Sequence, residues 1–194
     1  MTIDPLYGFL FLGAFSPGPN IIMVATSGAR FGFRRTIPNI FGILLGVGII
    51  AGLAGLGMGT LLNQFPVLKT AMRVVSVGWM LWLAWGLWHA RPLGESDNDK
   101  PMGFIESVLF QWVNPKLWAI SFAASSGYPS DRTPIEEAFR LSTALMEVNT
   151  LALTFWSLTG VALSYLLKHA FAWMIFTRTM AFSLVLVGVL LLVP

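Results

Sequence analysis

The stretch FLGAFSPGPNIIMV (residues 11–24) decides the fold, because two prolines and a glycine interrupt an otherwise apolar segment at 17–19. Proline lacks a backbone N–H and clashes with the carbonyl four residues earlier in a helix. Unsatisfied backbone groups are costly in hydrocarbon, so irregular backbone survives there only where it is buried in protein or faces a wet cavity. The break therefore predicts a binding site within a membrane-embedded helix.

The composition places the chain among membrane proteins. Of its 194 residues, 56% are hydrophobic and 11% are charged, whereas soluble domains carry about 25% charged residues. Six apolar segments approach the roughly 20 residues that a transmembrane helix needs. They cover residues 6–27, 38–62, 70–89, 103–126, 140–167 and 171–193. We expect an all-α membrane protein that forms a single transmembrane domain over 1–194.

Several functional classes are excluded or disfavoured. The chain contains no cysteine, which excludes disulfides, thiol catalysis and thiolate metal sites. Its formal net charge is +3, but it has no arginine-rich stripe with interleaved aromatic residues, so we expect no nucleic-acid partner. No histidine lies centrally in a segment and the acidic residues do not cluster there. We therefore expect neither an enzyme nor a cofactor or metal site.

A second proline break occurs in the fourth segment, within VNPK (113–116). The polar stretch 89–103 divides the chain into halves of about 1–90 and 103–194, each with three segments and each beginning with a broken one. Because three is odd, a second half that repeats the first would cross the membrane in the opposite direction. Paired interrupted segments mark the binding site in transporters built this way. The sequence predicts two inverted three-helix repeats.

The two breaks together predict a site for an anion. Helices that restart at Asn20 and Lys116 would expose free N–H groups and the positive ends of two helix dipoles. Asn114 lies about 16 Å into its segment, near the middle of a ~30 Å hydrocarbon core. Two positive helix ends that meet there suit a carboxylate. The predicted substrate-binding residues are Ser16, Pro17, Gly18, Pro19, Asn20, Asn114, Pro115, Lys116 and Asn149.

Lys116 requires a negatively charged neighbour. A cation deep in the bilayer costs about 3 kcal/mol or more, so an anion should lie beside it. Glu106, Glu147 and a substrate carboxylate are the candidates. A buried carboxylate can hold a proton and carry it across the membrane. Glu147 is the preferred residue for proton coupling, and Glu106 is the second.

Simpler interpretations of these residues stay open. The prolines are compatible with kinks that neighbouring helices satisfy. Asn149 is compatible with a hydrogen bond between helices, and Glu147 with an ion pair to Arg178 that holds two helices together. Each of these roles is structural and involves no substrate.

Basic residues are unevenly shared between the two ends of the predicted bundle. Ten of the twelve lie near segment ends, six at one end and four at the other. The positive-inside rule makes the richer end cytoplasmic, with both termini outside. The six are Arg30, Arg34, Arg35, Arg91, Lys100 and Lys168.

Four stretches resemble motifs of the RhtB family of amino-acid exporters, in the LysE superfamily. FSPGPNIIMVATSGARFGFRRTIPNIFGILLGVG (15–48) is similar to the family signature and GFIESVLFQWVNPKLWAISF (103–122) to its second motif. EVNTLALTFWSLTGVAL (147–163) and FTRTMAFSLVLVGVLLL (176–192) resemble its last two spans. The motif positions are Ser16, Pro17, Gly18, Pro19, Asn20, Gly28, Gly32, Asn114, Pro115, Lys116 and Asn149.

The resemblance implies a multi-pass exporter in the bacterial inner membrane. It implies export of small amino acids or their derivatives by proton antiport, and a homodimer as the assembly. One departure is SSGYPSDR (125–132), where the family continues with a Pro-Gln-Phe sequence. The alternative function is metal-ion efflux, found in the same superfamily, and an intramembrane enzyme and a channel are the rivals from other classes.

Overall fold

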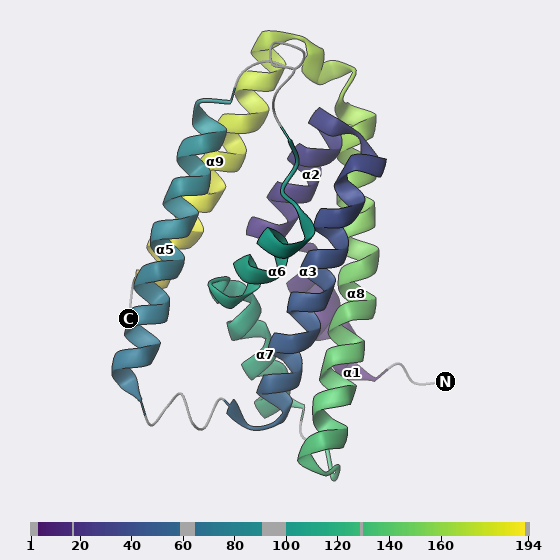
Figure 1. Cartoon of the computed structure of the whole chain (residues 1–194), viewed down its shortest axis with the longest axis vertical. Helices are drawn as coiled ribbons and strands as arrows, with labels where there is room; N and C mark the ends of the chain where they lie inside the picture. Colours follow the sequence, from purple (N-terminus) through teal and green to yellow (C-terminus); the bar gives the residue numbers. More distant parts are fainter. Residues whose placement is uncertain (1–3, 17, 59–64, 91–99, 129, 193–194) are drawn as a thin grey trace.

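The computed structural model describes residues 4–16, 18–58, 65–90, 100–128 and 130–192, and this part of the chain contains helices and no strand (Figure 1). The all-α prediction is confirmed. The helices are α1 Pro5–Phe15, α2 Pro19–Phe31, α3 Phe33–Gly55, α5 Pro66–Trp88, α6 Phe104–Trp112, α7 Pro115–Gly127, α8 Pro134–Leu163, the 3-10 turn η1 Leu166–Lys168, and α9 Ala170–Leu192.

Each of the six predicted apolar segments coincides largely with helix, with α1 and α2 sharing the first and α6 and α7 the fourth. Residues 59–62 of the second segment and residue 193 of the sixth lie outside the described residues. Among the described helices, α3 alone is long and apolar enough to cross a bilayer by itself. The α1–α2 pair, bent by 56°, would make a second crossing if the two helices form one span. A count of six crossings therefore stays a prediction.

Both predicted helix breaks are present. α2 begins at Pro19 and α7 at Pro115, each one residue before the predicted restart at Asn20 and Lys116. Proline suits the first position of a helix, because the N–H it lacks would have no partner there. The side chain of Asn114 caps α7 by accepting the N–H of the helix's third residue at 3.4 Å.

Helices from one half of the chain pack mainly against helices from the other half. α3 and α8 pack against each other at the centre, and α5 packs against α9 at one side (Figure 1). α1 and α2 pack on α8, whereas α6 and α7 pack on α3. In Figure 1, α1 and α2 rise while α6 and α7 descend, α3 descends while α8 rises, and α5 rises while α9 descends.

Glycines allow two of these helix pairs to meet backbone to backbone. A Cβ at Gly160 on α8 would lie 2.0 Å from the carbonyl oxygen of Ala25 on α2. A Cβ at Gly42 on α3 would lie 2.3 Å from the carbonyl oxygen of Phe104 on α6. Larger side chains at these two positions would move whole helices, because the neighbouring atoms belong to backbone.

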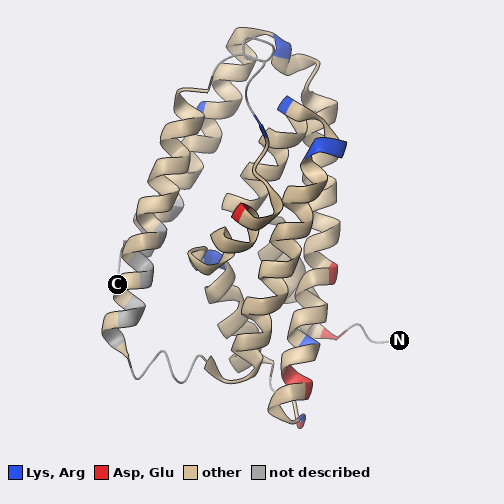
Figure 2. Cartoon of the chain, in the orientation of Figure 1, with Lys and Arg blue, Asp and Glu red and all other residues tan. Residues whose placement is uncertain are grey.

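The two ends of the bundle differ in charge (Figure 2). The α2–α3 junction and η1 lie at the same end and carry Arg30, Arg34, Arg35 and Lys168. The other end holds the starts of α1 and α8, with the acidic residues Asp4, Asp131, Glu136 and Glu137 and the basic residues Arg132 and Arg140.

Local contacts secure the acidic end. Thr133 caps α8 and forms a capping box with Glu136. Asp4 caps α1 and pairs with Arg140 at 3.4 Å. The Leu6 N–H, with the Arg140 guanidinium, holds the pKa of Asp4 below its usual range. These contacts place the start of α1 against the first turns of α8.

Candidate functional site

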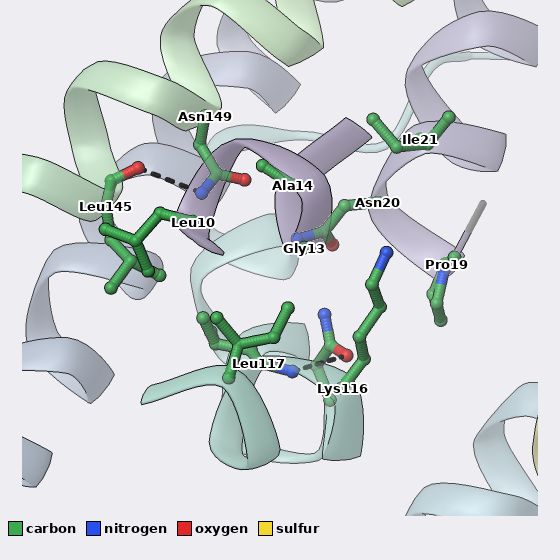
Figure 3. Close-up of a pocket in the computed structure, with 13 residues that line it drawn as sticks. Leu10, Gly13, Ala14, Pro19, Asn20, Ile21, Lys116, Leu117, Leu145 and Asn149 are labelled. Carbon is green, nitrogen blue, oxygen red and sulfur yellow. Dashed lines mark hydrogen bonds between the residues drawn. The ribbon is translucent and has the colours of Figure 1, made fainter. Parts of the chain in front are cut away.

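A small cavity lies where the two helix breaks meet (Figure 3). Its polar lining comes from both halves of the chain, and apolar residues of α1, α7 and α8 complete it. The volume is about 30 Å³, enough for about one or two water molecules and less than an amino acid needs. The predicted site residues that line it are Gly18, Pro19, Asn20, Asn114, Lys116 and Asn149.

Three other predicted residues are placed differently. Ser16 and Pro115 lie at the breaks without lining the cavity. The Ser16 hydroxyl donates to the carbonyl of Gly13 at 2.9 Å, which is one of the groups that a proline four residues later leaves unpaired. Pro17 lies outside the described residues. The breaks themselves, rather than every residue in them, form the cavity.

Lys116 reaches from one break to the other. Its Nζ donates to the carbonyl oxygen of Ser16, the residue that ends α1. A Cβ at Gly18 would lie 2.7 Å from Lys116 Cδ and 2.9 Å from Nζ, so the side chain lies over this glycine. The ion pairs among the described residues involve Arg140 and leave Lys116 without a carboxylate. A cation in the cavity is thus satisfied by a neutral carbonyl.

Gln111 belongs to the site although sequence reasoning did not single it out. Its side chain is 0% exposed, and its Nε2 donates to Asn20 Oδ1 at 3.1 Å. Its Oε1 accepts from Asn20 Nδ2 at 2.9 Å and from Asn114 Nδ2 at 3.2 Å. One carboxamide therefore joins the two breaks, through contacts between residues that are 91 positions apart in the chain. A signal was available, since Gln111 is a polar residue in an apolar segment, four positions before Pro115.

Asn149 faces the cavity from α8 (Figure 3). Its Nδ2 donates to the carbonyl oxygen of Leu145 in the same helix at 2.9 Å. No hydrogen bond joins it to another helix among the described residues, so the interhelical interpretation does not hold there. Its carboxamide oxygen is an acceptor that has no described partner and is available to a ligand.

Glu147 does not lie in the cavity, and the burial expected of it is wrong. Its carboxylate is on the exposed face of α8 and accepts a hydrogen bond from the Tyr7 hydroxyl at 2.8 Å. The reason is helical geometry, because residues two apart point to different faces and Asn149 takes the inner one. The ion pair with Arg178 is also wrong, since that guanidinium lies 4.9 Å from the centre of the Trp88 ring.

Glu106 is likewise outside the cavity. It is exposed in the first turn of α6, where its carboxylate accepts the backbone N–H of Gly103 at 2.9 Å. This is the capping position of a helix start, which fully accounts for an acidic residue there. Proton coupling by either carboxylate stays a hypothesis without support from position.

Comparison with known proteins agrees with a transport site at the two helix breaks. The family described as LysE type translocator matches residues 11–194. The chain belongs to the LysE type translocator family. This confirms the resemblance seen in the sequence and makes the protein a membrane transporter rather than an enzyme.

Curated relatives of this LysE-type translocator are named cysteine/O-acetylserine efflux proteins. The one from Salmonella choleraesuis (strain SC-B67) is 26% identical over 171 residues, covering 87% of each chain. The one from Klebsiella pneumoniae subsp. pneumoniae is 25% identical over 160 residues, covering 81% of each. That of Escherichia coli O1:K1 / APEC is 24% identical over 160 residues. No solved structure shows significant similarity.

Proposed function

We propose that this LysE-type translocator exports a small amino acid, of the size and chemistry of cysteine or O-acetylserine, across the bacterial inner membrane. The observation that carries the proposal is the convergence of Asn20, Asn114 and Lys116 on one cavity at the starts of two helices. The names of the relatives support the substrate class. The LysE family match supports transport as the activity.

The cavity supplies partners for both charges of a zwitterion. The Lys116 ammonium, the Asn20 and Asn114 amides and the N-terminal ends of α2 and α7 would bind the carboxylate. The free carboxamide oxygen of Asn149, together with the Ser16 carbonyl once Lys116 releases it, would accept from the substrate ammonium. The partners of the amine in this assignment are neutral acceptors, of which Asn149 lines the cavity.

The cavity is smaller than the proposed substrate. At about 30 Å³ it cannot hold an amino acid, so transport requires that the helices around it separate. Pairing of α3 with α8 and of α5 with α9, and the opposite chain directions of the counterparts, support two inverted repeats that rock against each other. The basic end would face the cytoplasm, from which the substrate enters.

Proton antiport is the energy source that we propose for export against a gradient. Lys116 is the ionisable side chain among the described residues of the cavity lining, whereas Glu147 and Glu106 lie elsewhere. A substrate that carries no net charge gains nothing from the membrane potential alone, so export against its gradient needs exchange with an ion. Dependence of efflux on an imposed pH difference in sealed vesicles tests this part separately.

Transport of O-acetylserine by purified protein in vesicles tests the site. We expect Lys116→Ala and Asn20→Ala to lower the rate by roughly 10-fold or more, as loss of a hydrogen bond to a charged group predicts. Lys168→Ala, which removes an exposed lysine on η1, is the matched control and should transport like the parent. Folded Lys116→Ala and Asn20→Ala proteins that both transport at the parent rate would place the site elsewhere.

A further inference from the structure

We infer that Gln111 is an internal competitor of the substrate: its carboxamide oxygen accepts from the two side-chain amides that would otherwise bind the substrate carboxylate. The inference rests on the proposed function and assigns a positioning role to a residue outside the predicted site. In this view, displacement of Gln111 by the substrate links substrate binding to separation of the helices around the cavity.

Each of the two amides makes one of its hydrogen bonds to Gln111. Gln111 Oε1 accepts from Asn20 Nδ2 at 2.9 Å and from Asn114 Nδ2 at 3.2 Å, one amide from each helix break. A carboxamide oxygen and a carboxylate oxygen are equivalent acceptors in geometry. The carboxylate is charged, and its hydrogen bonds are roughly twice as strong. A substrate carboxylate is therefore able to displace the neutral oxygen of Gln111 from both amides.

Lys116 follows the same pattern. Its Nζ donates to the Ser16 carbonyl oxygen, which is a neutral acceptor at the C-terminal end of α1. Each of the three groups that would recognise a carboxylate thus makes a hydrogen bond to a neutral oxygen of the protein itself.

Gln111 cannot leave by turning its side chain alone. Its Nε2 also donates to Asn20 Oδ1 and to the Ser107 carbonyl, both at 3.1 Å. The stem packs against α3, where a Cβ at Gly46 would lie 2.5 Å from Gln111 Cγ. Release of Asn20 therefore requires α6 to shift relative to α2. Because these helices belong to different halves, that shift would separate the two halves at the cavity.

A purely structural role of Gln111, in which it only holds α2 and α6 together, predicts the opposite effect of its removal on substrate binding. If Gln111 merely supported the site, its removal would loosen the donors and weaken substrate binding. If it competes with the substrate, removal frees the donors and strengthens binding, while the empty protein becomes less stable. The sign of the change in affinity separates the two roles.

Binding of O-acetylserine to the purified full-length protein provides the test. We expect Gln111→Met, which keeps the length of the side chain but removes the acceptor, to lower the Kd by about fivefold, the equivalent of one net hydrogen bond. Asn39→Leu is the control, because it removes another buried amide, 1% exposed, that does not line the cavity. Its Kd should match that of the parent. Equal or weaker binding by Gln111→Met overturns the inference.

A second variant tests the inference by protein stability as well as by binding. Gln111→Glu should place a permanent carboxylate on the same two amides, close to Lys116. At pH 8 we expect O-acetylserine binding to be lost. We also expect a smaller fall in unfolding temperature than a carboxylate buried elsewhere would cause, because the two amides and Lys116 offset the loss of the donor to Asn20 Oδ1 and the Ser107 carbonyl. The parent is measured at the same pH as the reference.

The outcomes of the two variants separate the inference from the proposed function. Asn39→Asp is the control for burying a carboxylate away from the cavity, and it should be strongly destabilised. Equal destabilisation of Gln111→Glu at pH 8 overturns the inference even if the parent binds no O-acetylserine. Absence of parent binding, together with a stable Gln111→Glu protein, instead contradicts the proposed substrate and keeps the anion-binding role of the two amides.

Discussion

Lys116 shows how a single residue depends on its neighbour at the other break. The side chain passes over Gly18, and a Cβ there would lie 2.7 Å from Cδ. The backbone of Gly18 is extended, with φ of −172°, a conformation that any residue adopts. Glycine is needed at this position for the space of its missing side chain and not for its backbone freedom.

Gly18→Ala should therefore impair binding more than stability. The added methyl group would displace the Lys116 ammonium from its place beside the cavity, and we expect a rise of about tenfold in the Kd for O-acetylserine, in the range of one lost charged hydrogen bond. Gly8→Ala, on the exposed face of α1 with nothing within 4 Å, is the control. Unchanged affinity in Gly18→Ala would show that Lys116 does not contact the substrate.

At the scale of elements, the position of the cavity depends on how closely α2 approaches α8. The contact is made backbone to backbone, since a Cβ at Gly28 would lie 2.2 Å from the Ser157 carbonyl oxygen and one at Gly160 would lie 2.0 Å from that of Ala25. Small residues permit this approach in membrane proteins, where packing rather than water exclusion drives helix association. The contact sets the place at which α2 begins.

Gly160→Ala should separate α2 from α8. No side-chain rotation can relieve a clash with backbone atoms, so we expect a loss of roughly 1–3 kcal/mol, the usual range for overpacking. Unfolding of the detergent-solubilised protein measures it. Gly78→Ala on α5, where nothing lies within 4 Å, should instead be neutral or slightly stabilising, because alanine favours helix. Similar stabilities of the two variants would contradict this packing.

For the whole molecule, the unequal charge of the two ends predicts its orientation. The α2–α3 junction and η1 form a basic end, and the starts of α1 and α8 form an end rich in acidic residues (Figure 2). Basic connections are retained on the cytoplasmic side of the membrane. The end with Asp131 should therefore face outward, and the end with His169 should face the cytoplasm.

The absence of cysteine makes this orientation simple to measure. In intact cells, a membrane-impermeant thiol reagent should label Asp131→Cys, because this exposed residue precedes α8 at the acidic end. His169→Cys, exposed between η1 and α9, should react only after the membrane is permeabilised. The parent is an unlabelled control. The reverse labelling pattern would invert the proposed direction of transport.

The sequence by itself determined the helical class, the interruption of helices at the prolines, and the start of α8 at a Thr-Pro capping box. These features follow from local chemistry, because a missing N–H, a side-chain cap and an apolar run act within a few residues. The sequence also pointed to Asn20, Asn114 and Lys116. A broken helix leaves backbone N–H and carbonyl groups without helical partners, and this holds whichever way the chain packs.

Only the tertiary structure decided which of these groups meet. The pairing of Gln111 with Asn20 arises from the packing of α2 on α8 and of α6 on α3, which brings together segments 91 residues apart. The packing of other helices around α8 likewise left Glu147 on its exposed face. Helical periodicity tells which residues share a face, but the neighbours packed around a helix determine which face turns inward, and those neighbours come from distant parts of the chain.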